Sequence, residues 1–195
     1  IPWFEDWEQD YFTAVLRMEE ALNLHQESTR RRLEEHLDRS ITDLGSAKEA
    51  LHELIAEYRE RGAVGIKLAH AYSRTLHSER VSELEAAATF NRALRGGRLT
   101  AVDVKRLQDY IIFFLAGLCA DFGLVFDIHT GVQGKWGRVE ESNPLHLRPL
   151  IHAHRRVRFS LYHGGYPFTR EIGMLAKHSP NVWLNLAWMY VVTME

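Results

Sequence analysis

The chain has 195 residues, of which 46% are hydrophobic and 26% are charged, a composition that predicts a folded protein with one sizeable core. Its formal net charge of −2 argues against a dedicated nucleic-acid-binding protein. Residues 1–61 carry 15 acidic and 8 basic residues, whereas the remainder carries 11 and 16. The second part is therefore mildly basic, which either suits an anionic small-molecule substrate or simply solvates a surface.

Cysteine content and hydropathy indicate the compartment. The single cysteine, Cys119, lies in an apolar helical pattern and excludes an internal disulfide, which favours a reducing, cytoplasmic location. No charged leader with an apolar segment opens the sequence, and the apolar stretches at 110–120 and 184–190 are too short to span a membrane. Because the sequence starts at Ile1 and not at a methionine, we expect it to be a fragment.

The first 61 residues predict helices. Apolar residues recur at three- and four-residue steps from Trp7 to Leu22, which predicts a helix over 5–38. After a break, Ser46 is expected to cap a second helix, with Glu49 completing a capping box. We therefore expect residues 1–61 to be a helical segment that packs on the rest of the chain.

From residue 62 onward, strands and helices alternate. The sequence predicts strands at 63–68, 124–129, 157–162 and 182–186, and helices at 79–95, 101–122, after Asn143-Pro144, and at 168–178. This alternation indicates right-handed βαβ units and a parallel sheet, either open and doubly wound or part of a barrel. No Gly-rich phosphate loop follows a strand, so we predict an α/β fold in which residues 62–195 form the central part of a (β/α)₈ TIM-type barrel.

Two successive predicted strands end in a histidine followed by small residues. FDIHTG (126–131) carries His129, and YHGGYPF (162–168) carries His163. A neutral imidazole at a strand end can bind a divalent metal, and glycines allow close approach. One such histidine would more often be structural, but the pair predicts a site. Because His163 shares a strand face with Phe159 and Leu161, the strand must bend at the glycines for its ring to point inward.

Other polar residues follow the same strand ends. Lys67 either bridges metals once carboxylated, attracts an anion, or extends to solvent. Asn185 either binds a ligand or completes a polar layer. The glycine-rich loop at 130–143 is either a mobile lid over an anionic or carbonyl-bearing substrate or an ordinary flexible loop. The substrate-binding candidates are Tyr72, Arg74, Lys135, Arg138, Arg170 and Asn185.

A family resemblance is carried by GAVGIKLAHAYSR (62–74), LQDY (107–110), FDIHTG, SNPLHLRPLI (142–151), YHGGYPFTREIGMLA (162–176) and PNVWLNLAW (180–188). Together these resemble the amidohydrolase-related branch of the metal-dependent hydrolase superfamily, most of all the amidohydrolase-like N-terminal part of nodulin/glutamine-synthetase-type fusion proteins. The resemblance implies a barrel with a divalent metal, zinc or manganese. It further implies that His129 is a metal ligand, that Lys67 matches a metal-site lysine, and that His163 is a catalytic acid/base or a second ligand.

Two ligand groups of that family have no match in this sequence. Its first-strand H-x-H is absent, and its eighth-strand aspartate would follow Glu195. The resemblance therefore implies that the full-length protein hydrolyses C–N amide or related carbonyl-derived bonds through a metal-activated water, while this chain alone is inactive. The alternatives are a metal-dependent non-oxidative decarboxylase and a non-catalytic barrel module. Exposed strand edges also predict association with another chain, such as a second copy in a homo-oligomer.

Overall fold

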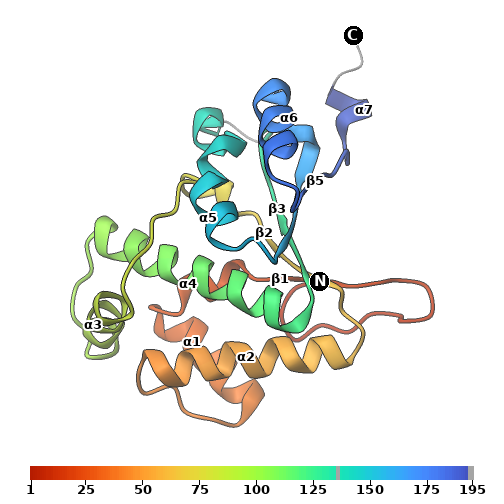
Figure 1. Cartoon of the computed structure of the whole chain (residues 1–195). Coiled ribbons are helices and arrows are strands. Elements are labelled where there is room, and N and C mark those ends of the chain that lie inside the picture. Colours follow the sequence, from red (N-terminus) through yellow and green to blue (C-terminus); the bar gives the residue numbers. More distant parts are fainter. Residues whose placement is uncertain (135–136, 193–195) are drawn as a thin grey trace. The chain divides into compact units, whose positions relative to one another are not determined.

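The computed structural model describes residues 1–134 and 137–192 (Figure 1). The chain forms two units, the first made of Ile1–Val64 and Glu79–Leu118 and the second of Gly65–Ser78 and Cys119–Glu195. No helix within the described ranges is both long and apolar enough to cross a membrane.

The first unit is mostly helical. Its elements are β1 (Val15–Arg17), the 3₁₀ helix η1 (Glu19–Asn23), α1 (Glu27–Leu37), α2 (Leu44–Glu60), α3 (Glu83–Leu94) and most of α4 (Ala101–Phe122). The helix predicted over 5–38 is wrong before Glu27. The amide of Arg17 instead donates to the Ile1 carbonyl at 2.7 Å, and the Trp3 ring nitrogen reaches the Met18 sulfur at 3.3 Å. The apolar residues of this stretch do not share one buried face either, because Tyr11 is exposed while Met18 and Leu22 are buried.

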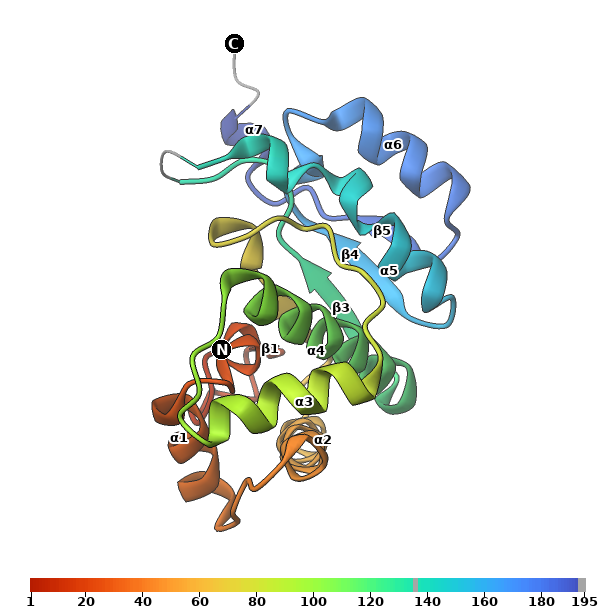
Figure 2. The ribbon, with the colours of Figure 1, turned by 90° about the vertical axis from the view of Figure 1, so that its left-hand side faces the viewer.

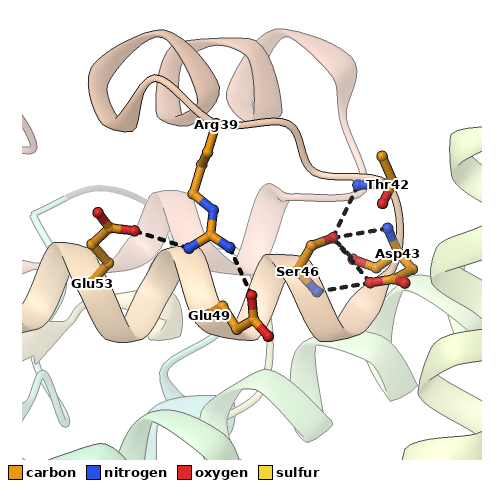
Figure 3. A network of polar contacts seen from close by, with 6 residues as sticks. All are labelled: Arg39, Thr42, Asp43, Ser46, Glu49 and Glu53. Atoms are coloured by element: carbon orange, nitrogen blue, oxygen red, sulfur yellow. Dashed lines mark hydrogen bonds and ion pairs between the residues drawn. The ribbon is translucent and has the colours of Figure 1, made fainter.

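Helix α2 begins one turn earlier than predicted, because Asp43 and not Ser46 is its cap. The Ser46 amide donates to Asp43 Oδ1 at 2.7 Å, and the Asp43 amide donates to Ser46 Oγ at 3.0 Å (Figure 3). This reciprocal pair is a capping box with serine in the place usually held by glutamate. Glu49 instead accepts from Arg39, which also donates to Glu53 and so ties the end of α1 to α2.

The second unit contains the predicted parallel strands. Its elements are β2 (Gly65–Leu68), η2 (His70–Tyr72), β3 (Val125–Ile128), η3 (Val139–Ser142), η4 (Pro144–Leu147), α5 (Arg148–Ala153), β4 (Arg158–Leu161), η5 (Tyr162–Gly165), α6 (Thr169–His178), β5 (Val182–Leu184) and α7 (Met189–Val192). Strands β2, β3, β4 and β5 lie side by side in this order, and each neighbouring pair is parallel. The α/β class and the parallel arrangement are therefore confirmed.

The strands of the second unit have one apolar and one polar face. Ile66, Phe126 and Phe159 alternate onto the apolar face, where they are fully buried. Helices α5 and α6 lie over the strands in Figure 2. The other face carries a row in which Lys67 is aligned with Asp127, and Asp127 with Ser160. Because the strands are parallel, all their carboxyl ends meet at one edge, and the residues that follow them are brought together there.

Candidate metal centre

His129 and His163 leave the strand ends by different routes. The His129 amide donates to the Leu68 carbonyl at 2.9 Å, so His129 extends the pairing of β3 with β2 by one residue. His163 instead adopts a left-handed conformation with φ 62° and ψ 26°. This conformation costs about 1–2 kcal/mol for a residue with a side chain. The bend predicted at the glycines thus starts at His163 itself, and its ring turns toward His129.

The two imidazole rings face each other edge to face. His163 Nε2 lies 3.2 Å from His129 Nδ1, and the ring centroids are 4.6 Å apart. The outer nitrogens are held by backbone: His129 Nε2 donates to the Val132 carbonyl at 2.7 Å, and His163 Nδ1 donates to the Ala187 carbonyl at 2.8 Å.

These outer hydrogen bonds assign the tautomers. A carbonyl oxygen can only accept, so both outer nitrogens must carry the hydrogen. In neutral rings, the facing nitrogens of His129 and His163 then each carry a lone pair and no hydrogen. Two lone pairs at 3.2 Å repel each other unless a cation lies between them. The pair therefore forms a site for a shared proton or a metal ion.

A metal ion fits this site better than a proton does. Burial lowers the pKa of His129 to about 4; the hydrogen bond to Val132 opposes this shift, and the charges of His163 and Lys67 add to it. A proton is therefore disfavoured at neutral pH. Histidine nitrogens lie about 2.0–2.1 Å from zinc, so two of them at a tetrahedral angle are roughly 3.3 Å apart. Ligand histidines also typically donate their other N–H to a carbonyl, as both rings do here.

The described residues supply two such ligands and no more. Among residues 1–134 and 137–192, no group of three or more histidine, cysteine, aspartate or glutamate side chains is arranged to hold a metal ion. The fit thus rests on the facing nitrogens and their fixed tautomers.

Two contacts, through Thr130 and Gly131, join the two histidine-bearing loops, and a third, through Ser142, closes the loop that follows His129. Thr130, fully buried, donates through Oγ1 to the Tyr162 carbonyl at 2.7 Å. Ser142 Oγ donates to the Gly131 carbonyl at 2.8 Å. At Gly131, where φ is +68°, a Cβ atom would lie 2.1 Å from the Tyr166 carbonyl oxygen. Glycine at position 131 therefore lets the backbone after His129 approach the backbone at Tyr166. The sequence had predicted only that the small residues here leave space for close approach to the histidine.

Asn185 shapes the turn that holds His163. Its side-chain Oδ1 accepts from the Ala187 backbone amide at 2.9 Å, and its own backbone amide donates to the Leu161 carbonyl at 2.8 Å. The Ala187 carbonyl is the acceptor for His163 Nδ1. Asn185 therefore acts on the site by positioning the acceptor of that histidine.

Lys67 lies close to the pair, but its ammonium contacts an aromatic ring. Its Nζ is 3.2 Å from the centroid of the Tyr162 ring. Burial raises the pKa of the neighbouring Asp127, although Ser160 and Lys67 act in the opposite direction. A cation–π contact favours the charged ammonium, whereas a ligating lysine must be neutral or carboxylated. Lys67 as a metal ligand stays a prediction.

The substrate-binding candidates are placed differently from one another. Tyr72 is half exposed, and its ring centroid lies 4.6 Å from that of His129. Arg74 donates to the Thr75 and His77 carbonyls and so braces its own loop. Arg138 and Arg170 are exposed. Lys135 lies outside the described residues.

The sequence interpretation did not assign Thr130 or His70 to the site. His70 is buried within the turn that follows β2, and the available signal was a histidine two residues beyond a strand end. Nothing in the sequence pattern distinguished Thr130 from an ordinary loop residue.

Known proteins resemble this chain over most of its length. A family model described as Amidohydrolase matches residues 41–193. A uronate isomerase of Nostoc punctiforme is 28% identical over an alignment of 178 positions that covers 82% of this chain and 37% of that protein. Protein fluG of Emericella nidulans is 43% identical over 63 residues, 32% of this chain and 7% of that protein.

Solved structures support the same fold. A protein described as a metal-dependent hydrolase from Lactobacillus casei matches with a TM-score of 0.68 and 25% identity over 89% of this chain and 43% of its own. The uronate isomerase of Thermotoga maritima has a TM-score of 0.72 at 18% identity, a likeness of fold, over 88% of this chain and 42% of its own. The chain thus spans less than half the length of each relative, as a partial barrel would.

Proposed function

Because the chain belongs to the amidohydrolase family, we propose that it is part of a divalent-metal-dependent enzyme in which His129 Nδ1 and His163 Nε2 hold the ion. The observation that carries this proposal is the 3.2 Å separation of two nitrogens whose hydrogens are both committed elsewhere. Of the two metals that the resemblance implies, zinc suits imidazole ligands better, while manganese would need more oxygen ligands. The likeness to nodulin/glutamine-synthetase fusion proteins stays a prediction.

The proposed reaction is hydrolysis of a C–N amide or a related carbonyl-derived bond. A bound ion supplies a water of lowered pKa and polarises a carbonyl group. His163 has one lone pair, on Nε2, because Ala187 holds its Nδ1 hydrogen. That nitrogen is the atom that holds the ion or accepts a proton from the attacking water.

Nearby side chains supply binding for a small, anionic substrate. The Lys67 ammonium helps to lower the pKa of His129, so it contributes a positive charge near the site. The half-exposed Tyr72 ring beside His129 offers an apolar wall against which a substrate can lie. Both features favour a substrate with a carboxylate and a flat or apolar part.

Isomerisation of a uronate is a second candidate. It is favoured by the Nostoc punctiforme uronate isomerase, which matches 82% of this chain at 28% identity. A uronate is an anionic carbonyl compound, so the same polarised carbonyl and positive charge would serve it. The two reactions differ in product: hydrolysis releases an amine, whereas isomerisation releases nothing.

The test uses the full-length protein loaded with Zn²⁺ or Mn²⁺ and three assays run side by side. These detect amine release from an amide panel, ketose formation from uronates, and carbon dioxide release from carboxylated substrates. His129→Ala should abolish whichever activity is found, whereas His178→Ala, at an exposed histidine of α6, should leave it unchanged. Carbon dioxide without amine would favour the decarboxylase, and full activity of His129→Ala would overturn the proposal.

A further inference from the structure

His70 is a buried histidine whose ring is not hydrogen-bonded within the described part of the chain. The residue is 3% exposed, and neither Nδ1 nor Nε2 has a hydrogen-bond partner there. Burial, with the charges of Arg74 and His129, lowers its pKa to about 3, so the ring is neutral at physiological pH. It then carries one N–H donor and one acceptor, both unused.

Such a ring is destabilising unless something else pairs with it. Buried polar groups in folded proteins almost always have a hydrogen-bond partner, which is protein or ordered water. An apolar side chain of similar size would fill the same space without this cost. The retained imidazole therefore implies a partner that the described chain does not itself provide.

The position of His70 points to the metal centre as the source of that partner. His70 opens η2, directly after β2, at the same edge as His129 and His163. Both residues after it contact the His129 loop: Gln133 Nε2 donates to the Ala71 carbonyl at 2.8 Å, and the Tyr72 ring packs against His129.

The backbone hydrogen bonds of His70 do not require an imidazole at this position. Its carbonyl accepts from the Ser73 and Arg74 amides, each at 2.9 Å. These bonds fix η2 and would form equally with any side chain at position 70. The turn therefore accounts for the backbone of His70 but not for its buried ring, whose pKa the charge of His129 helps to lower.

We propose that His70 is a third imidazole of this centre, which hydrogen-bonds a water molecule held by the divalent ion and so strengthens ion binding. The inference rests on the proposed function. His70 is a positioning residue here and not a ligand, in keeping with the two-ligand set of the described residues. Removal of such outer hydrogen-bond partners typically weakens metal affinity by about 10–100-fold.

The test separates ion binding from folding. Zn²⁺ affinity by calorimetry and thermal unfolding in EDTA are measured for the wild type, His70→Leu and His70→Gln. The matched control is His25→Leu, which removes an imidazole of the first unit whose Nδ1 is also unpartnered among the described residues. His129→Ala reports on the ion site itself.

The inference predicts that replacing His70 lowers the affinity for Zn²⁺ without lowering the melting temperature of the metal-free protein. His70→Leu should bind Zn²⁺ about 10–100-fold more weakly while its metal-free form melts at the wild-type temperature or above. His70→Gln, which keeps a donor and an acceptor, should bind with intermediate affinity, and His25→Leu should bind like the wild type.

Two results would overturn the inference in distinguishable ways. If His129→Ala loses Zn²⁺ binding but His70→Leu binds as tightly as the wild type, His70 holds at most a structural water and this inference alone fails. If the wild type and His129→Ala bind Zn²⁺ equally or not at all, the proposed ion site fails and His70 loses its role with it.

Discussion

Replacing Thr130 by valine removes the one hydroxyl that links the two histidine-bearing loops. Valine has the same shape, so no cavity forms. The Tyr162 carbonyl, which accepts from Thr130 Oγ1 at 2.7 Å, loses this donor in a position where Thr130 is fully buried. Because Tyr162 directly precedes His163, the loss of this hydrogen bond affects the backbone that orients the His163 ring toward His129.

The expected cost follows from the burial of this hydrogen bond. Leaving a buried acceptor unpaired costs about 1–3 kcal/mol, and we expect about 2 kcal/mol here. For a chain of this size, 1 kcal/mol shifts the melting temperature by roughly 2–4 °C, so Thr130→Val should melt about 4–8 °C lower. Zn²⁺ affinity should fall as well, since the facing nitrogens lose their fixed separation.

Thermal unfolding in EDTA and Zn²⁺ calorimetry measure the two effects. Thr169→Val is the matched control, because Thr169 is exposed at the start of α6 in the same unit. It should change stability by no more than about 0.5 kcal/mol. A Thr130→Val variant that melts with the wild type and binds Zn²⁺ equally well would refute the view that this bond aligns the centre.

Three further substitutions or conditions test the same structure. Gly131→Ala should fail to fold stably or lose Zn²⁺ binding, measured by circular dichroism and calorimetry, because its Cβ would lie 2.1 Å from the Tyr166 carbonyl. In EDTA, the free energy of unfolding should fall by about 2 kcal/mol from pH 7 to pH 5 on account of His70. Burial lowers the pKa of His70 to about 3 in the folded protein, whereas in the unfolded chain a histidine has a pKa near 6.5 and takes up the proton first. His70→Leu should remove this component from urea titrations at the two pH values. Asn185→Ala should weaken Zn²⁺ binding several-fold with little change in fold, because the Ala187 carbonyl that orients His163 loses its support.

The proximity of His129 and His163 could be predicted from the sequence because it depends on strand order. FDIHTG and YHGGYPF end consecutive parallel strands, and the carboxyl ends of such strands meet at one edge. The bend before His163's ring was also foreseeable from Gly164 and Gly165. The alternation of strand and helix patterns predicted the parallel arrangement, because parallel neighbouring strands need a crossover connection between them.

The chemistry of the centre could not be predicted, because backbone groups set it. The tautomers of His129 and His163 depend on the carbonyls of Val132 and Ala187, which every residue type possesses. Only the three-dimensional path of the loops brings those carbonyls to the rings. The burial of His70 is likewise a tertiary property.

The errors in the first unit have local causes. The three- and four-residue spacing from Trp7 to Leu22 matched a helix by coincidence, while a three-residue strand such as β1 is too short to show a period of its own. Ser46 and Asp43 are both good caps, and the sequence could not tell which one begins α2.

The most direct test of the centre is a long-range ¹H–¹⁵N spectrum of the histidine rings, recorded at pH 7 before and after addition of Zn²⁺. The structure predicts that His129 carries its hydrogen on Nε2 and His163 on Nδ1, and that Zn²⁺ shifts the resonances of His129 Nδ1 and His163 Nε2 together. A hydrogen found on either facing nitrogen in the metal-free protein, or a spectrum that Zn²⁺ leaves unchanged, would contradict the account.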